Sequence, residues 1–549
     1  MKIFKNWRPN LILLLILLFG AAIISRLIFL QIINHDLYRA LAQGQQNVFK
    51  PIKGQRGQIF FSGGEILATN GEGMYLFICP EEMEEKEKTA QKLAEILEID
   101  KEDIYLRAQK DSLFEKIKDD LTEEEVRILK ENNLEGVYLG QVPKRSYPQG
   151  EMASGIIGFV GGSERGQYGL EGYYNNVLEG EEEFNRSNFS NKSNGGDLSL
   201  GVNYNIQFIA EKLLKSAQES LDIESGQIII IDPNIGKIIA LAEYPGFDPN
   251  YYSDVEDFDI FQNKSVQKLF EPGSTFKPFT MAAALDQGKI TPQTTYIDSG
   301  NVRVSGYTIE NYNSRVFGEA TMTEVLEKSI NTGAVFAEKQ VGHDKFLEYL
   351  DKFGFFNPTN IDIQGEVSSE NKGLKEGYEV NFATAAFGQG IEITPMQLVR
   401  GFSAIANGGK LVKPYVVEKT IGSDGQTKET EISFSDKIIS SDTASKLTAM
   451  LVSVIENGYA KSAKIPGYYI AGKTGTAQVP YSAIGIDKRG YSDKTWQSFI
   501  GFFPAFNPRF LILVKLDNPK ANTAEYSALP IFKQMAKHMI DYYAIPPDY

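Results

Sequence analysis

The chain has 549 residues, more than one compact core usually holds, so two or more folded units are expected. Its hydrophobic share of 42% and charged share of 23% are those of an ordinary globular protein, and its net charge of −15 argues against nucleic-acid binding, because an acidic surface repels phosphates. A single cysteine, Cys79, excludes an internal disulfide and a cysteine-rich metal site. With only three histidines in addition, we expect no metal site.

An apolar stretch near the N-terminus predicts a membrane anchor. Residues 11–25 are uncharged and almost wholly apolar, and the apolar character resumes after Arg26 and continues to residue 33. A spanning helix needs about 20 such residues. The long Arg26 side chain can reach the membrane interface without ending the helix. We therefore expect an anchor over residues 11–33.

Positive charges before this stretch predict its orientation. Lys2, Lys5 and Arg8 favour a cytoplasmic tail over residues 1–10, which places the rest of this single-pass chain outside the cytoplasm. A cleaved signal peptide is the alternative. We favour the anchor, because the small-residue cleavage site around residues 20–22 is poor and apolar sequence runs past it.

Residues 34–195 are predicted to form a first extracytoplasmic domain. Residues 56–64 are typical of a strand that enters a Gly-Gly turn. Apolar residues at helical spacing predict surface helices within residues 81–99 and 121–131, and we interpret their acidic faces as solvated. A polar stretch at residues 179–197, rich in Asn, Ser and Gly, marks the boundary of the domain.

Residues 196–549 are predicted to form a second domain of the α+β class. The apolar runs 228–231 and 238–242 flank a Gly236-Lys237 turn and predict a buried β-hairpin. Residues 510–516 predict another buried strand. Helical patterns lie between these strands, and mixed strands and helices of this kind indicate a sheet with packed helices.

Three short polar motifs follow one another in the second domain: Ser274-Thr-Phe-Lys277, Ser329-Ile-Asn331 and Lys473-Thr-Gly475. In this order they match the parts of a serine acyl-transfer site. Each motif alone is weak, because residues 265–268 and 369–372 also match the first pattern. The Lys-Thr-Gly triplet occurs once. The prediction therefore depends on the order of the motifs and on their surroundings.

Ser274 is the candidate nucleophile. It follows a Pro272-Gly273 turn and precedes a strongly helix-forming segment, which places it at the start of a helix with Lys277 one turn away on the same face. A serine hydroxyl needs a nearby base. A lysine can be that base only when burial or a second cation keeps it neutral, and Lys473 is the candidate for the second cation. The alternative is that Ser274 only caps the helix.

Ser329 and Asn331 are candidate catalytic residues of the second motif. At positions i and i+2 of a loop, both side chains can face one cleft, where the hydroxyl relays a proton and the amide holds a substrate carbonyl. An ordinary turn uses the same residue types and is the alternative.

The third motif is predicted to lie on a strand, with Thr474 and Thr476 on one face and Lys473 on the other. Gly475 leaves room for a substrate backbone at an edge strand. Two hydroxyls and a cation suit a peptide carboxylate, so Thr474, Gly475 and Thr476 are the candidate substrate-binding residues. A glycine bulge on a solvated strand is the alternative.

The chain resembles the class B penicillin-binding proteins, the monofunctional D,D-transpeptidases of bacterial cell-wall synthesis. The resemblance runs from about residue 25 to residue 549 and includes Arg56-Gly57, Arg145, Tyr147-Pro148, Gly169-Leu-Glu171, Asp232-Pro233, Pro272 to Pro278 and Phe387-Gly-Gln-Gly390. It implies a transpeptidase domain like that of the serine β-lactamases, with an antiparallel sheet, flanking helices and a helical subdomain. An elongated pedestal of the dimerisation type and the membrane helix would precede it.

The resemblance also implies a reaction. Ser274 would attack the penultimate D-Ala carbonyl of a stem peptide ending in D-Ala-D-Ala, with Lys277 as base, and an amine of a neighbouring stem peptide would accept the acyl group. Ser329, Asn331 and Lys473 would move protons and position the substrate. Backbone N–H groups of Ser274 and Thr476 would form the oxyanion hole, and Thr474 and Thr476 would hold the terminal carboxylate. β-Lactams would acylate Ser274, and no metal or organic cofactor is needed.

The implied partners are a membrane glycan polymerase and division-complex proteins, contacted through the anchor helix and the pedestal. Residues 271–277 are most similar to the septal, cell-division branch of the family. Two departures from the family pattern are Leu200-Gly-Val-Asn203 and Gln497, which stands where a histidine is common.

Three other functions compete with a septal transpeptidase. The first is an elongation-type transpeptidase, and the second is a hydrolase of the D,D-carboxypeptidase or β-lactamase type. The third is a β-lactam sensor or scaffold without catalysis. The anchor and the large pedestal favour a transferase, the short predicted cytoplasmic tail argues against a sensor, and no motif residue is missing, which argues against an inactive scaffold.

Overall fold

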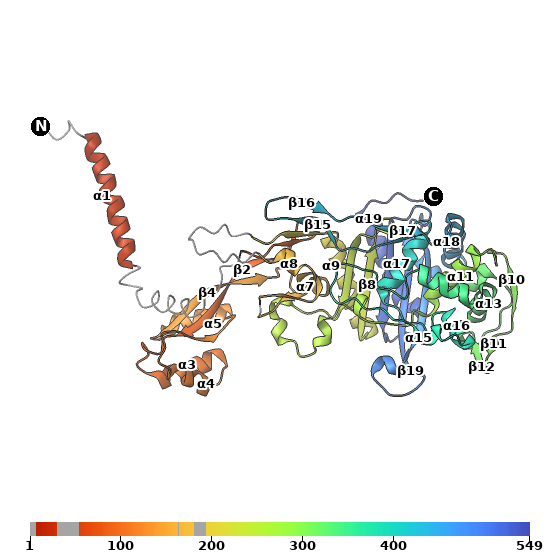
Figure 1. Cartoon of the computed structure of the whole chain (residues 1–549), viewed down its shortest axis with the longest axis horizontal. Helices are drawn as coiled ribbons and strands as arrows, with labels where there is room; N and C mark the ends of the chain where they lie inside the picture. The colour runs from red at the N-terminus through yellow and green to blue at the C-terminus, as the bar shows by residue number, and fades with distance from the viewer. Residues whose placement is uncertain (1–6, 30–53, 163, 181–193) are drawn as a thin grey trace. The chain divides into compact units, whose positions relative to one another are not determined.

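The computed structural model describes residues 7–29, 54–162, 164–180 and 194–549. They fall into two compact units (Figure 1). The N-terminal unit contains residues 7–29 and 70–146, and the C-terminal unit contains residues 54–69, 147–180 and 194–549. Segments of the predicted first domain therefore occur in both units, and the predicted boundary after residue 195 stays a prediction.

Helix α1 (Trp7–Ile28) contains most of the predicted anchor. Its window Leu11–Ile28 has a mean hydropathy of 2.8, and none of that window is buried inside the protein. Among the described residues it is the one helix long and apolar enough to cross a membrane. An apolar helix without protein packing suits a lipid environment, which suggests a membrane anchor. The end of the predicted anchor, residues 30–33, lies outside the described residues.

The N-terminal unit packs three helices against a small group of paired strands. Strands β3 (Glu115–Lys118) and β4 (Val137–Ser146) pair with β2 (Ile66–Ile78). The helices are α3 (Lys86–Leu97), α4 (Lys101–Ala108) and α5 (Glu123–Asn132). Helices α3 and α5 confirm the two predicted surface helices. Cys79 is buried, and burial raises the pKa of its thiol to about 11.

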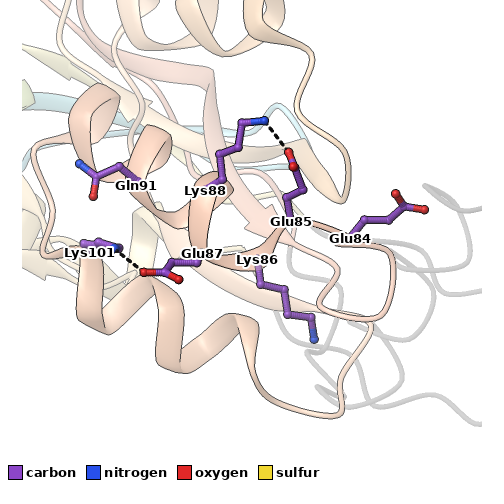
Figure 2. A pocket seen from close by; sticks show the side chains of 7 residues that line it. All are labelled: Glu84, Glu85, Lys86, Glu87, Lys88, Gln91 and Lys101. Carbon is purple, nitrogen blue, oxygen red and sulfur yellow. Dashed lines mark hydrogen bonds and ion pairs between the residues drawn. The ribbon is translucent and has the colours of Figure 1, made fainter.

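A shallow hollow beside α3 and α4 is lined only by Glu, Lys and Gln side chains (Figure 2). Two ion pairs cross it, from Lys88 to Glu85 at 2.6 Å and from Lys101 to Glu87 at 3.1 Å. Exposed pairs of this kind contribute little free energy. The hollow has the character of a solvated helix face, as predicted for this acidic segment, and it contains none of the motif residues.

The C-terminal unit is built on a five-stranded antiparallel sheet with the order β18-β19-β20-β8-β9. The strands are β8 (Ser225–Ile231), β9 (Ile238–Tyr244), β18 (Ala471–Pro480), β19 (Tyr491–Phe503) and β20 (Phe510–Asp517). The predicted hairpin is β8 and β9, and the predicted strand at residues 510–516 is β20, so both predictions are confirmed. Strand β18, which carries the third motif, is an edge strand.

Helices pack on this sheet (Figure 1). Helix α9 (Tyr204–Leu221) contacts β8 and β9, and α19 (Ala528–Tyr542) contacts β19 and β20. Helix α17 (Pro395–Ala406) contacts β8 and β20, and α18 (Ser441–Glu456) contacts β18. The apolar face of each helix is thereby removed from water, which is the main stabilising contribution in such a layered fold.

A helical subdomain surrounds α11 (Lys277–Asp286). Helices α13 (Asn331–Val341) and α14 (His343–Lys352) pack on α11, and α12 (Met322–Glu327) and α16 (Glu379–Ala385) pack on α13. Two antiparallel pairs adjoin it: β10 (Thr295–Asp298) with β13 (Gly318–Thr321), and β11 (Asn301–Val304) with β12 (Tyr307–Glu310). The sheet, its helices and this subdomain confirm the predicted α+β class.

The remaining strands of the C-terminal unit join distant parts of the chain. Strand β1 (Ile59–Phe60) pairs in parallel with β7 (Asp197–Leu200), which pairs with β15 (Val417–Ile421), which pairs with β16 (Thr427–Glu429). The other short elements are α6 (Ser154–Ile157), β5 (Phe159–Val160), β6 (Gly166–Gln167), α7 (Gly169–Tyr173), α8 (Asn175–Leu178), α10 (Lys264–Gln267), α15 (Lys372–Lys375), β14 (Lys410–Val412) and β17 (Phe434–Lys437).

Candidate active site

Ser274 lies in a single 3₁₀ turn, residues Gly273–Phe276, that continues directly into α11. It is therefore inside the first helical turn and not a cap, because Pro272 and Phe276 occupy the cap positions of the two helical segments. Pro278 is tolerated in the first turn of α11, where its missing N–H has no helical partner to lose. Because residues three apart lie on the same face of a helix, Lys277 lies beside Ser274, as the spacing predicts.

Lys277 is fully buried and contacts all three polar groups of the first two motifs. Its Nζ lies 3.0 Å from Ser274 Oγ and 3.1 Å from Ser329 Oγ. It donates to Asn331 Oδ1 at 2.8 Å and to the Ser329 carbonyl oxygen at 2.6 Å. The last two oxygens are pure acceptors. A neutral lysine amine has two N–H groups, and each of these two oxygens accepts a hydrogen bond from one of them. The lone pair of the nitrogen can then accept a hydrogen bond from the Ser274 hydroxyl.

Ser329 and Asn331 lie at the junction of α12 and α13. Ser329 has a φ of +55°, a left-handed conformation that is uncommon for serine. Asn331 is the first residue of α13, and its Nδ2 donates to the Glu310 carbonyl at 3.0 Å. The side-chain oxygen of Asn331 therefore faces Lys277, and one N–H of the amide remains for a substrate carbonyl.

Lys473 approaches the same serine from strand β18. Its Nζ donates to Ser329 Oγ at 3.0 Å, so Ser329 Oγ lies between two lysine amines. Burial alternates along β18, with Lys473 and Gly475 buried and Thr474 and Thr476 half-buried. This alternation confirms the predicted strand and its two faces. All three motifs thus meet at one point, although they come from a 3₁₀ turn, a helix junction and an edge strand.

The structure gives a different reason for a glycine at position 475 than the room for a substrate backbone that the sequence predicted. A Cβ there would lie 2.9 Å from the Pro272 carbonyl oxygen and 2.9 Å from Thr275 Cγ2. The space beside Gly475 is therefore filled by the loop that carries Ser274, and the glycine allows that loop to approach β18. Thr476 Oγ1 accepts a hydrogen bond from the Ala524 N–H at 3.1 Å, which fixes the hydroxyl next to a short 3₁₀ turn at Ala524–Tyr526.

Both lysines of the site have lowered pKa values. Burial and the nearby charge of Lys473 hold the pKa of Lys277 well below its usual range. Burial lowers the pKa of Lys473 to about 7, against the attraction of the Glu525 carboxylate. A neutral Lys277 can accept a proton from Ser274, and a charged Lys473 can stabilise negative charge. These shifts support the predicted need for burial and a second cation.

Several residues that hold the site together were not among the predicted site residues. The Glu271 carboxylate, 5% exposed, accepts from the Tyr491 hydroxyl at 3.0 Å, and burial raises the pKa of Glu271 to about 7. The Gly273 N–H donates to the Gly388 carbonyl at 2.9 Å, which ties the nucleophile loop to a second loop. The one signal in the sequence for such a role is the position of Glu271, three residues before Ser274.

A buried polar network supports the second motif. Thr332 Oγ1 donates to Asp298 Oδ1 at 2.7 Å, and Asn311 Nδ2 donates to the same carboxylate at 2.9 Å. Both donors are buried, and Asp298 is 2% exposed. A fully bonded network of this kind makes one local arrangement rigid. It fixes the start of α13, where Asn331 lies.

The two competing matches to the first motif belong to structural interactions. Ser265 is buried and donates to Glu243 at 2.8 Å, while Lys268 pairs with Asp259 at 3.2 Å. In the other match, Ser369 accepts from the Asn371 N–H at 3.2 Å. Neither serine lies within hydrogen-bond distance of a lysine amine in the described part of the chain. Ser274 is thus the one described serine among the three with a buried lysine beside its hydroxyl.

Comparisons with known proteins agree with this geometry. The family model described as penicillin binding protein transpeptidase domain matches residues 226–537, and the one described as penicillin-binding protein dimerisation domain matches residues 51–198. The chain is 32% identical over 534 residues to "Stage V sporulation protein D" of Bacillus subtilis (strain 168), covering 92% of this chain and 82% of that protein.

A second relative is "Probable peptidoglycan D,D-transpeptidase PbpC" of Pseudomonas aeruginosa, 29% identical over 570 residues, with 99% of this chain and 96% of that protein covered. The crystal structure of penicillin binding protein 3 from Mycobacterium tuberculosis complexed with aztreonam has the same fold, with a TM-score of 0.72, 24% identity and coverage of 90% and 98% of the two chains. The chain therefore belongs to the class B penicillin-binding proteins. It is an enzyme of this family, and in its sequence the dimerisation domain precedes the transpeptidase domain.

Proposed function

We propose that this protein is a peptidoglycan D,D-transpeptidase that cross-links stem peptides through an acyl-enzyme on Ser274, in septal wall synthesis. One observation carries the proposal: Lys277 Nζ contacts Ser274 Oγ, Ser329 Oγ and Asn331 Oδ1 at 3.0, 3.1 and 2.8 Å. A buried amine in contact with a nucleophile and a proton relay is what acyl transfer from an amide requires. Relatives named as peptidoglycan D,D-transpeptidases support the choice of substrate.

Acylation begins with proton transfer from Ser274 Oγ to the neutral Lys277 amine. Ser274 Oγ then forms a bond to the penultimate D-Ala carbonyl carbon, and the electron pair of the carbonyl moves to its oxygen. In other serine enzymes, each N–H donor to the corresponding oxygen is worth roughly 3 to 4 kcal/mol. We assign these donors to the backbone of Ser274 and Thr476.

The leaving amine of the terminal D-Ala must receive a proton before it departs. Ser329 Oγ can supply it, because it lies 3.1 Å from Lys277 Nζ and 3.0 Å from Lys473 Nζ. The proton taken from Ser274 then passes through Lys277 and Ser329 to the leaving nitrogen as the C–N bond breaks. Thr474 and Thr476, with the charge of Lys473 behind them, suit the terminal carboxylate of the departing residue.

Transfer to an amine completes the reaction. An amine of a second stem peptide attacks the acyl carbon, gives its proton to the same relay and releases Ser274. A hydrolase of the carboxypeptidase or β-lactamase type would use water in this step. β-Lactams fit the first step of the proposal because they present an acyl group with a carboxylate next to it, and a solved relative carries aztreonam.

The septal assignment rests on the sequence of residues 271–277, Glu-Pro-Gly-Ser-Thr-Phe-Lys. An elongation role would use the same chemistry. A role in sporulation is the second candidate, because the relative at 32% identity is named for stage V of sporulation. Depletion of the protein in its own cells separates the three: blocked septa give filaments, blocked elongation gives round cells, and a sporulation role leaves growing cells unchanged.

For localisation we propose a bacterial plasma-membrane protein with a cytoplasmic N-terminus. Its C-terminal unit, which contains Ser274 and is called the catalytic unit from here on, would be extracytoplasmic. Apolar helix α1 and the basic residues before it support this orientation. The proposed partners are a glycan polymerase and division proteins that contact the anchor helix and the dimerisation domain. Protease added outside intact spheroplasts should degrade the catalytic unit, whereas a cytoplasmic catalytic unit would be protected.

Product analysis tests the proposed reaction. The detergent-solubilised full chain is incubated with a donor peptide ending in D-Ala-D-Ala and an excess of an amine acceptor, and the products are separated by mass. We expect release of D-Ala together with the cross-linked peptide, and neither product with Ser274→Ala. Release of D-Ala with only the shortened free peptide would support the hydrolase and contradict the transferase.

A further inference from the structure

Glu338 is a buried carboxylate near the end of α13, outside the three motifs. Its side chain is 1% exposed, and within the described part of the chain neither of its oxygens accepts a hydrogen bond. An ionised carboxylate is costly in such a place. Burial accordingly raises the pKa of Glu338 to about 7. None of the acyl-transfer steps uses this group, so its presence needs another explanation.

The imidazole of His343 lies beside this carboxylate. Gly342, with a φ of +82°, ends α13, and His343 begins α14. His343 Nε2 is 3.6 Å from Glu338 Oε1, slightly more than a hydrogen-bond distance. The imidazole ring stacks on Phe382 of α16 with the ring centres 4.1 Å apart. A protonated His343 can donate to Glu338, and beside a neutral His343 the carboxyl group can hold the proton itself, so the two groups can share one proton.

This pair lies at the contact between α13 and α16 (Figure 1). Asn331 and Glu338 are seven residues apart, which is about two helical turns, so they lie on the same face of α13 and about 10 Å apart along its axis. Between them on this face, Ala334 and Val335 pack in one apolar cluster with α16 and the residues that follow it. The contact that contains Glu338 therefore also positions the catalytic Asn331.

Helix α16 connects the same contact to the nucleophile loop. The Ala386 carbonyl, directly after α16, accepts from Thr280 Oγ1 of α11 at 2.8 Å. Two residues further on, the Gly388 carbonyl accepts from the Gly273 N–H at 2.9 Å. A separation of α13 from α16 would therefore displace Asn331 on one side and a support of Ser274 on the other.

Within the described chain, two further charges act on Glu338. Lys339, the next residue on α13, lowers its pKa, and Glu379 in the first turn of α16 raises it. Both side chains are exposed. The charged groups of the other elements that pack on α13 have partners of their own: Lys277 and Asp286 on α11, Glu324 and Lys328 on α12, Lys345 and Glu348 on α14, Asp298 on β10, and Glu310 on β12. His343 is thus the neighbouring group whose nitrogen faces the carboxylate.

We propose that Glu338 and His343 are positioning residues that share one proton and keep α13 against α16 while they hold it. With the proton, the contact contains a neutral carboxyl group or a carboxylate paired with imidazolium. Without it, the contact contains an unpaired carboxylate, which draws in water and separates the helices. Acylation of Ser274 then slows, because Asn331 and the Gly388 carbonyl are displaced. The inference rests on the proposed function and adds to it a dependence on a proton outside the catalytic residues.

The pH dependence of penicillin labelling tests the pair. Second-order rate constants for a fluorescent penicillin are measured from pH 6 to 9 on the detergent-solubilised full chain and on Glu338→Gln, which has a similar shape and no charge. Dividing the rate constant of the variant by that of the parent removes the titration of the catalytic lysines, which both proteins share. Because the pKa of Glu338 is raised, the parent loses the proton as the pH rises, so we expect a ratio of about onefold at pH 6 and about fivefold at pH 9, with a midpoint near pH 7.

Two further variants separate the proton from the packing. His343→Gln removes one of the two proton sites, so Glu338 alone holds the last proton less strongly than the pair does. Relative to Glu338→Gln, its loss of labelling should therefore begin at a lower pH than that of the parent. Glu376→Gln, at an exposed carboxylate just before α16, is the matched control and should follow the parent at every pH.

Hydrogen exchange on the parent gives the same test without a substitution. Exchange is measured at pH 6.5 and 8.5 and corrected for the intrinsic rate at each pH. Peptides from α13 and α16 should lose protection several-fold at the higher pH, whereas those from α9 should keep it.

Three outcomes would overturn the inference and leave the proposed function standing. A Glu338→Gln variant that changes the labelling rate by one factor at every pH would make Glu338 a packing residue alone. A His343→Gln profile identical to that of the parent would remove His343 from the pair. Equal protection of α13 and α16 at the two pH values would show that their contact does not depend on the proton. A folded parent that penicillin does not label would instead contradict the proposed function, and with it the coupling to acylation.

Discussion

At the scale of single residues, the site depends on two lysines that share one serine. Lys277 and Lys473 both contact Ser329 Oγ, at 3.1 and 3.0 Å. The two amines are buried, so the protein stabilises the neutral form of each, and the charge of one disfavours the charge of the other. The pair can therefore hold one proton at neutral pH and pass it through Ser329.

Removal of Lys473 should slow acylation strongly. Lys473→Ala takes away the cation that lowers the pKa of Lys277 and one of the two proton partners of Ser329. We expect the second-order rate constant for labelling by a fluorescent penicillin to fall by roughly 10²- to 10³-fold. Lys464→Ala, at an exposed lysine that pairs with Glu456, should change it less than twofold. A loss below threefold in Lys473→Ala would contradict the assigned role.

The acylation rate should have a bell-shaped pH dependence. Below the lowered pKa of Lys277 the amine is protonated and cannot accept the Ser274 proton, so the rate rises with pH on the acid side. Above the pKa of Lys473, about 7, the second amine loses its charge, so the rate falls again. Rates of penicillin labelling from pH 4 to 10 measure both limbs. A rate that keeps rising through pH 9 would contradict a charged Lys473.

The spacing of residues in the sequence predicted which side chains meet at the site. It did not predict the contacts that support them. The distance of three residues between Ser274 and Lys277 is a short-range property, and a helix brings the two together. The Ser329 carbonyl that accepts from Lys277 could not be predicted, because it depends on a φ of +55° at a residue type that rarely adopts it. The burial of Glu271 was equally hidden, since its partner Tyr491 is 220 residues away.

At the scale of elements, the nucleophile loop is fixed by contacts on two sides. Gly475 and Ala477 of β18 lie against one side, and the Gly388 carbonyl accepts from the Gly273 N–H on the other. Phe270 and Ile393 exchange two backbone hydrogen bonds just before the loop, at 2.9 and 3.1 Å. The position of Ser274 is thus set by a strand and by a second loop, in addition to its own helix.

Gly388→Ala should disturb this loop. Gly388 has a φ of +83°, and a Cβ there would lie 2.1 Å from the Gly273 carbonyl oxygen. We expect a loss of roughly 3 kcal/mol or more in the stability of the catalytic unit and slower penicillin labelling. Gly425→Ala, with a φ of +78° and open space around it, should cost only about 1 kcal/mol and keep the labelling rate. Thermal unfolding of both variants measures the difference, and equal midpoints would contradict the role of Gly388.

At the scale of the whole molecule, the catalytic unit is assembled from segments far apart in the chain. Ile59 pairs with Leu198, and Leu200 pairs with Val417. Local periodicity predicted the hairpin, the edge strand of the third motif and most helices named in advance. It could not predict that residues 54–69 and 147–180 share a compact unit with the catalytic sheet, because such pairing depends on partners more than 100 residues away.

The anchor can be tested by charge insertion. Leu15→Lys combined with Leu18→Lys places two charges in the middle of helix α1, each costing about 2.5 to 3.5 kcal/mol in a membrane-spanning position. We expect the variant to leave the membrane pellet after a high-salt wash, whereas the parent remains there. Leu106→Lys, at an exposed leucine of α4, is the control and should remain with the parent. A double variant that still sediments with membranes would argue against α1 as the anchor.

The central claim is that Ser274 is the residue that becomes acylated. The full chain in detergent is incubated with a penicillin, digested, and the modified peptide is identified by mass. We predict one adduct on Ser274 in the parent and in Ser369→Ala, whose serine belongs to a competing motif, and no adduct in Ser274→Ala. An adduct that persists in Ser274→Ala, or that maps to another serine of the parent, would contradict the assignment.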